Sequence, residues 1–200
     1  MNLPNKITVA RIILIPFFMI FAFPTPEWFP GHDFLVNVGP YIALVIYIIA
    51  SVTDAVDGHI ARKRNLITSF GKFLDPIADK LLVTAALLVL VPQNLMYLWA
   101  AMIILTREFI VTGLRLLAAG EGKVIAAGKL GKIKMVLQTV AIIVLQIAYL
   151  IAQWSQPFWA DAGRVLIVAG DVTMWAAVIM TIVSGAEYVA KNIQFLKKDM

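Results

Sequence analysis

Long apolar segments fill most of this chain, and they restrict it to a fold embedded in a membrane. A helix needs about 20 apolar residues to cross a bilayer. Hydrophobic residues make up 61% of the 200 residues and charged residues only 14%, far from the composition of a soluble domain. The sequence predicts an all-α integral membrane protein, a single domain over residues 1–200, with six transmembrane helices in one bundle at 7–24, 36–60, 73–92, 95–117, 133–153 and 165–188.

Lysine and arginine residues indicate which side of the membrane each connection faces. If the N-terminus is inside, almost all basic residues of the connections are cytoplasmic, and Arg164 is left in an outer connection. The start of the chain, from Asn2 to Asn5, is interpreted as a short interfacial segment before the first helix. We therefore expect a multi-pass protein of the cell membrane whose termini and active site are cytoplasmic. The net charge of +5 follows from the same bias, so no nucleic-acid partner is expected.

Four aspartates stand in or beside these apolar segments. Asp54 and Asp57 are three residues apart in the second segment, and Asp75 and Asp79 are four apart in the third, so each pair lies on one face of a helix. A carboxylate near lipid costs about 2.5 to 3.5 kcal/mol on insertion scales, which favours a polar cavity and a bound cation. Oxygen ligands at this density suit Mg²⁺ or Mn²⁺, shared with substrate phosphates. The alternative is that each carboxylate pairs with a nearby Lys or Arg.

Pro76 predicts where the third helix begins. A proline costs roughly 3 kcal/mol deep inside a helix but little in its first turn. We therefore expect this helix to begin only a few residues before Asp75, which would put the acidic cluster near the membrane interface. Gly58 and Ala61 lack bulk beside the aspartates, where a ligand or the neighbouring helix comes close.

The spacing of these residues resembles the signature of the CDP-alcohol phosphotransferases. The pattern Asp-x2-Asp-Gly-x2-Ala-Arg-x8-Gly-x3-Asp-x3-Asp is filled without a gap by Asp54, Asp57, Gly58, Ala61, Arg62, Gly71, Asp75 and Asp79. The stretches 2–11, 107–115 and 128–134 resemble the bacterial phosphatidylglycerophosphate synthases within that family. One departure is Met135, where the pattern has a threonine. The likeness covers most of the chain.

The resemblance implies a six-helix membrane enzyme, commonly a homodimer among membrane lipids. It implies transfer of the phosphatidyl group from CDP-diacylglycerol to glycerol 3-phosphate, with release of CMP and with two Mg²⁺ or Mn²⁺ ions as cofactor. The metal ligands would be Asp54, Asp57, Asp75 and Asp79, and Asp79 would also be catalytic as the proton acceptor. CDP-diacylglycerol would be bound by Asn5, Thr8, Gly58, Ala61, Arg62, Thr68 and Gly71.

The phosphate of the acceptor needs a separate set of cations. Arg107 and Arg115 are eight residues apart on roughly one helix face, and Lys132 and Lys134 enter the next helix, so we expect these four to bind glycerol 3-phosphate. A charge in the apolar surroundings of Arg107 needs a partner. Adjacent helical residues point about 100° apart, so Glu108 is expected to be an awkward partner and a ligand a better one. For Lys132, simple placement on the cytoplasmic side is an alternative.

Other functions share some of these features. A same-fold enzyme could use inositol phosphate or phosphatidylglycerol as acceptor. A membrane transporter would also keep buried carboxylates, although here the charges gather at one membrane face. A membrane prenyltransferase would use aspartate pairs and Mg²⁺, but its motifs do not resemble the Ala61-Arg62 element. The chain has no cysteine, which excludes thiolate metal sites and cysteine nucleophiles.

Overall fold

The computed structural model describes the backbone of residues 3–23, 27–64, 69–120, 128–153 and 157–192, with the side chains of 3–6, 54–76, 79, 120, 157 and 160 outside the description. These ranges are helical and contain no strand. The helices are α1 (Leu3–Ala22), α2 (His32–Asn37), α3 (Gly39–Arg64), α4 (Ser69–Leu90), α5 (Leu98–Gly120), α6 (Lys129–Ala152) and α7 (Pro157–Asn192). The predicted all-α architecture is confirmed.

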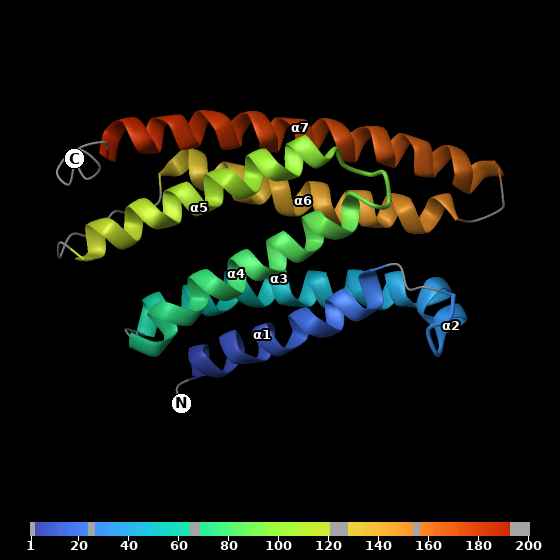
Figure 1. The fold of residues 1–200 in the computed structure, drawn as a ribbon, viewed down its shortest axis with the longest axis horizontal. Helices are drawn as coiled ribbons and strands as arrows, with labels where there is room; N and C mark the ends of the chain where they lie inside the picture. Colours follow the sequence, from blue (N-terminus) through green and yellow to red (C-terminus); the bar gives the residue numbers. More distant parts are fainter. Residues whose placement is uncertain (1–2, 24–26, 65–68, 121–127, 154–156, 193–200) are drawn as a thin grey trace.

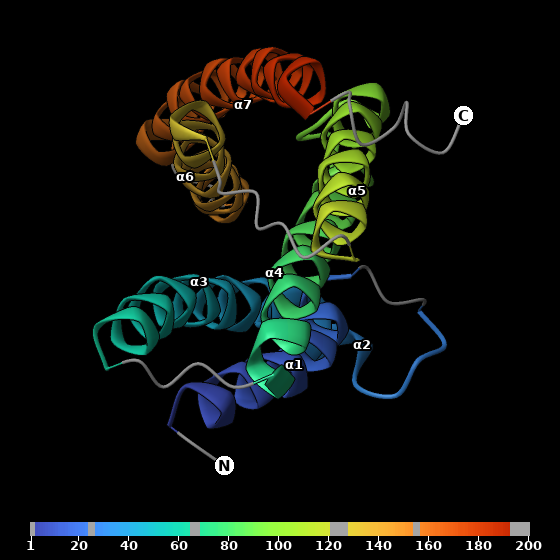
Figure 2. The same ribbon diagram turned by 90° about the vertical axis from the view of Figure 1, so that its left-hand side faces the viewer.

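The long helices run back and forth in two groups. Helices α1, α3 and α4 contact one another, and α7 packs against both α5 and α6. Helix α4 crosses from the first group toward the second, and α5, which follows it in the chain, belongs to the second group (Figure 2). The beginnings of α1, α4 and α6 and the ends of α3, α5 and α7 lie at the same end of the molecule, the left-hand end of Figure 1. Six of the described helices therefore bring residues to that end of the molecule (Figure 1).

Apolar side chains cover both the inside and the outside of this bundle. Phe18, Tyr47 and Leu145 are completely or almost completely buried in the core, whereas Phe109 and Val136 are largely exposed on the outer faces. Helix surfaces of this kind suit a lipid environment, in which packing rather than burial of apolar area holds helices together. Two described helical stretches, Lys129–Ala152 and Asp161–Asn192, are long and apolar enough to cross a membrane.

The remaining helices differ from these two in length or charge. The apolar parts of α1, α3 and α4 are shorter, at Ile7–Ala22, Gly39–Thr53 and Lys80–Leu90. Helix α5 has sufficient length, but it carries Arg107, Glu108 and Arg115. The number of membrane spans, expected to be six, stays a prediction.

Close approach between the helices depends on glycine. A Cβ atom at Gly39 would lie 2.6 Å from the carbonyl oxygen of Phe21, at the contact between α3 and α1. At Gly170 it would lie 2.7 Å from Leu145, at the contact between α7 and α6. Small residues at such positions let transmembrane helix backbones approach closely.

Several predicted helix boundaries differ from those of the structure. Helix α4 begins at Ser69, so Pro76 lies beyond its first turn. Helix α1 begins at Leu3, so residues 3–5 of the expected interfacial segment belong to its first turn, where a proline such as Pro4 is tolerated. Helix α7 spans Pro157–Asn192 because helical structure continues past the predicted apolar run into flanks that include charged residues such as Asp161 and Lys191.

Candidate functional site

The two aspartate pairs lie on neighbouring helices. Asp54 and Asp57 belong to α3, and Asp75 and Asp79 belong to α4, which contacts α3. The end of α3 and the beginning of α4 lie at the same end of the molecule (Figure 1). The side chains of these four aspartates are outside the described residues, as are those of Asn5, Gly58, Ala61, Arg62, Gly71 and the whole of Thr68. Their predicted roles stay predictions.

A cavity of about 400 Å³ lies between the two groups of helices, within the size range of small-molecule sites. Its described lining carries two acidic residues, Glu108 and Glu187, and seven basic ones. The excess of positive charge suits an anionic ligand. The basic residues are Arg11, Lys80, Arg107, Arg115, Lys132, Lys134 and Lys191.

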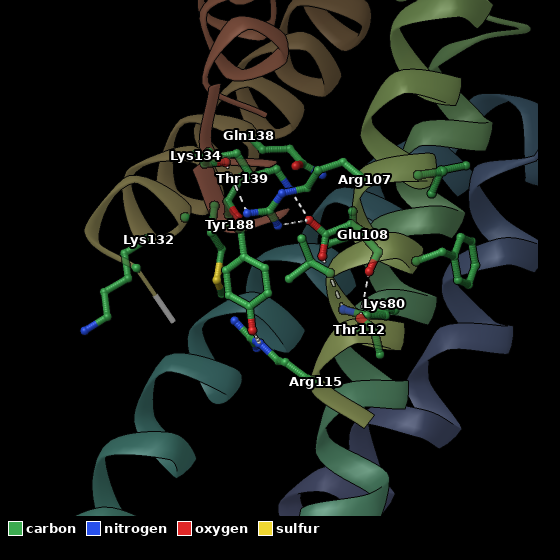
Figure 3. A pocket seen from close by; sticks show the side chains of 18 of the residues that line it. Lys80, Arg107, Glu108, Thr112, Arg115, Lys132, Lys134, Gln138, Thr139 and Tyr188 are labelled. Atoms are coloured by element: carbon green, nitrogen blue, oxygen red, sulfur yellow. Dashed lines mark hydrogen bonds and ion pairs between the residues drawn. The ribbon is translucent and has the colours of Figure 1, made fainter. Parts of the chain in front are cut away.

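The carboxylate of Glu108 is the centre of an ion-pair network in this cavity (Figure 3). Its Oε1 accepts hydrogen bonds from Lys134 Nζ at 2.7 Å and from Arg107 Nη1 at 2.8 Å. Its Oε2 accepts one from Lys80 Nζ at 3.2 Å. Three cations from three helices thus share one carboxylate, and they are held close together although they repel one another.

The contact between Arg107 and Glu108 corrects the sequence interpretation. Glu108 was expected to be an awkward partner because the two residues point in different directions from the helix. Both side chains are long, and the guanidinium reaches the carboxylate around the surface of α5. The direction of the Cα–Cβ bond alone does not decide which charged groups meet.

The side chain of Arg107 packs between two glycines beside the cavity. A Cβ atom at Gly185 of α7 would lie 2.9 Å from Arg107 Cγ, and one at Gly131 of α6 would lie 3.4 Å from Arg107 Nη2. The same Nη2 donates a hydrogen bond to Ser184 Oγ at 3.1 Å. The guanidinium is therefore fixed from both sides.

Arg115 and Lys132 lie at other parts of the lining. The Nε of Arg115 donates a hydrogen bond to the Tyr188 hydroxyl at 3.2 Å, and its guanidinium stands 5.5 Å from the centre of the Tyr188 ring. Lys132 is exposed, and its ammonium group points away from the Glu108 network in Figure 3. The structure thus brings Arg107, Arg115, Lys132 and Lys134 to one cavity, with Lys132 at its edge.

Several residues of this cavity were not predicted from the sequence. Lys80 is one of the nearby basic residues that could have paired with an aspartate, and Gln138 and Ser184 had no predicted role. Lys80 directly follows Asp79 in the motif, and Gln138 follows Lys134 by four residues, on the same helix face; these spacings could have drawn attention to them. Thr8, predicted to contact CDP-diacylglycerol, is buried in α1 and is not among the described lining residues.

Comparisons with known proteins agree with the motif. The model of the CDP-alcohol phosphatidyltransferase family matches residues 1–183. A Bacillus subtilis protein named CDP-diacylglycerol–glycerol-3-phosphate 3-phosphatidyltransferase is 48% identical over 98% of this chain and 97% of its own. An Escherichia coli protein of the same name is 37% identical over 88% of this chain and 90% of its own. A probable phosphatidylglycerophosphate synthase of Mycobacterium tuberculosis is 36% identical, over 96% and 82%. The predicted family is confirmed: this chain belongs to the CDP-alcohol phosphatidyltransferases.

Proposed function

We propose that this chain transfers the phosphatidyl group of CDP-diacylglycerol to glycerol 3-phosphate, forming phosphatidylglycerophosphate and CMP. The observation that carries the proposal is the 48% identity, over nearly the full length of both chains, with a relative whose name states this reaction. The basic cavity supports it, because an acceptor that carries a phosphate needs cations of its own in addition to any metal ions.

The four aspartates of α3 and α4 would hold Mg²⁺ or Mn²⁺. Four carboxylates on two contacting helices form an all-oxygen donor set, which fits these ions. Two bound ions would supply polarisation of the attacked phosphorus and stabilisation of negative charge on the leaving CMP. The motif assigns Asp54, Asp57 and Asp75 to this role, together with Asp79.

The remaining steps fall to the residues of the chain. The primary hydroxyl oxygen of glycerol 3-phosphate forms the new bond to the phosphorus attached to the diacylglycerol, and the bond from that phosphorus to the CMP oxygen breaks. Asp79 would accept the hydroxyl proton. Gly58, Ala61, Arg62, Thr68 and Gly71, with Asn5 and Thr8 of α1, would bind the CDP-diacylglycerol.

The cations of the cavity would hold the acceptor phosphate. Arg107 and Lys134 already converge on one carboxylate within 2.8 Å, which is the arrangement of donors that a phosphate oxygen also requires. Arg115 and Lys132 would extend this binding toward the open side of the cavity. Positioning of the acceptor by these groups supplies part of the rate enhancement.

The site would face the cytoplasm in a homodimer of six-span subunits in the cell membrane. The beginnings and ends of the helices support this topology, since the aspartate-bearing ends of α3 and α4 share one end of the molecule with the beginning of α6 (Figure 1). Positively charged residues such as Lys129 and Lys132 at that end match the cytoplasmic bias of membrane proteins.

An acceptor panel tests this function. Purified protein in detergent is given CDP-diacylglycerol, Mg²⁺ and one acceptor at a time, and CMP release is measured. We expect release with glycerol 3-phosphate and little with inositol phosphate, serine or phosphatidylglycerol. Release with inositol phosphate but not with glycerol 3-phosphate would assign the chain to another branch of the family, and no release with any acceptor would contradict a transferase.

A further inference from the structure

A buried glutamine in the wall of the cavity has no hydrogen-bond partner for either of its polar atoms among the described residues. Gln138 lines the cavity from α6 and is only 2% exposed. Neither its Nε2 nor its Oε1 has a hydrogen-bond partner in the described structure. Buried polar groups in native proteins are nearly always paired, so an amide unpaired at both atoms beside a cavity indicates a ligand group.

Two hydroxyl groups of the cavity lining already have hydrogen-bond partners. The Ser184 hydroxyl accepts a hydrogen bond from Arg107 and donates one to the carbonyl oxygen of Thr181 at 3.3 Å. The Thr112 hydroxyl donates to the backbone carbonyl of Glu108 at 2.7 Å. Gln138 differs from these hydroxyls because, among the described residues, both its NH2 group and its carbonyl oxygen stay open to a ligand.

The position of Gln138 relates it to the cations. It lies four residues, about 6 Å of helix rise, beyond Lys134 on the same face of α6. In Figure 3 its side chain is drawn beside those of Lys134 and Arg107. A group bound by the amide would therefore lie close to an anion bound by Lys134 and Arg107.

An alcohol hydroxyl is the group that fits. A hydroxyl both donates and accepts, as the amide does, and in glycerol 3-phosphate the 2-hydroxyl is on the carbon next to the one that carries the phosphoester. We propose that Gln138 binds this 2-hydroxyl and makes the cavity selective for phosphates of polyols. The inference rests on the proposed function. Among the described residues, no hydrogen bond commits the amide to another group.

The inference is tested by removing the 2-hydroxyl of the acceptor, the amide of Gln138, or both. The acceptors are glycerol 3-phosphate and 3-hydroxypropyl phosphate, which lacks only the 2-hydroxyl. For the unchanged protein we expect kcat/KM to favour glycerol 3-phosphate at least about tenfold, because an unmatched buried amide penalises the analogue. In Gln138→Met, which keeps the length and most of the volume, the preference should fall to within about twofold of one.

Gln146→Met is the matched control. Gln146 is on the same helix, is buried, and has an unpaired Nε2, but it lines a separate small cavity with Gln93 and Tyr149. The same substitution there should leave the preference between the two acceptors unchanged.

Three results would overturn the inference. The first is an equal loss of activity on both acceptors in Gln138→Met, which would indicate a packing role. The second is an unchanged protein that does not distinguish the acceptors. The third applies if Gln138→Met fails to assemble: Gln138→Asn, whose amide is withdrawn by one methylene, should then lose the preference, and retention of it would contradict the proposal. Absence of CMP release with glycerol 3-phosphate in the unchanged protein would instead contradict the proposed function.

Discussion

Three cations of the cavity depend on one carboxylate, that of Glu108. Lys80, Arg107 and Lys134 all donate hydrogen bonds to it, and bonds to a charged acceptor contribute about 1.5–3 kcal/mol each. In Glu108→Gln the cations lose their common counter-ion and separate. We expect KM for glycerol 3-phosphate to rise by about tenfold or more, as one such bond requires, measured by CMP release.

Glu187→Gln is the control for this prediction. Glu187 also lines the cavity, but it pairs with Lys191 on the exposed surface of α7, where an ion pair contributes little. Its substitution should change KM less than about twofold. A decrease of KM in Glu108→Gln would show that the carboxylate competes with the substrate for the cations instead of arranging them.

Arg107 and Lys132 should differ in their importance for the acceptor. Arg107 is held by Glu108 and Ser184, and its planar guanidinium has donors that a lysine does not reproduce. We expect Arg107→Lys to raise KM for glycerol 3-phosphate by about tenfold or more. Lys132→Ala should have a smaller effect, because Lys132 is exposed and screened by solvent. Equal effects of the two substitutions in the same kinetic assay would contradict this ranking.

At the residue scale, the sequence predicted the cations of the cavity better than it predicted their partners. Helical spacing and charge in an apolar surrounding were sufficient to select Arg107 and Arg115. The contacts of Glu108 with Lys80 and Lys134 join residues 28 and 26 positions apart in the chain. Periodicity within one helix carries no information about such pairs, so the counter-ion was not predicted.

At the scale of helix packing, Gly185 should control the position of Arg107. A methyl group there would lie 2.9 Å from Arg107 Cγ, so α7 or the arginine would have to move. We expect Gly185→Ala to raise KM for glycerol 3-phosphate several-fold, while KM for CDP-diacylglycerol changes little. Gly113→Ala on α5 is the control, because nothing lies within 4 Å of the added carbon. Normal kinetics in Gly185→Ala would show that the fit around Arg107 is loose.

The proposed metal site on α3 and α4 predicts that the activity depends on a divalent cation. If their aspartates hold Mg²⁺ or Mn²⁺, a chelator should abolish CMP release and either ion should restore it. Ca²⁺ should restore less, since it prefers more ligands at longer distances. Undiminished CMP release after exhaustive chelation would contradict the metal role of all four aspartates.

Asp79 has a second proposed role, which separates it from the other aspartates. Asp79→Asn removes the proton acceptor but keeps an oxygen ligand and nearly the same volume. We expect this variant to bind CDP-diacylglycerol with little loss and to release CMP at least about 100-fold more slowly, the contribution typical of a general base. Turnover close to normal would refute proton transfer to Asp79.

The order of the long helices was predictable from the sequence, but their ends and the short helix α2 were not. The apolar segments mark the part of a helix that contacts lipid, and the helical hydrogen bonds of α4 and α7 continue into polar residues beyond it. Pro76 was given too much weight, because a proline lowers the stability of a helix without always ending it. The short helix α2 lacks an apolar pattern of sufficient length.

At the scale of the whole molecule, the candidate site joins two groups of helices at one cavity. The aspartates belong to α3 and α4, and most of the cations belong to α5 and α6. The motif predicted the aspartates of α3 and α4 because all of them lie within one short stretch of sequence. The second group becomes a site only when α7 packs against α5 and α6, and this packing follows from the complete fold.

The most direct test of the proposed reaction is the stoichiometry of its products in one vessel. Purified protein is incubated with CDP-diacylglycerol, glycerol 3-phosphate and Mg²⁺, and CMP and the lipid product are quantified together by mass spectrometry. We predict one phosphatidylglycerophosphate for each CMP, with neither product formed when glycerol 3-phosphate is left out. CMP accompanied by phosphatidic acid, or a lipid product without CMP, would contradict a transfer of the phosphatidyl group to this acceptor.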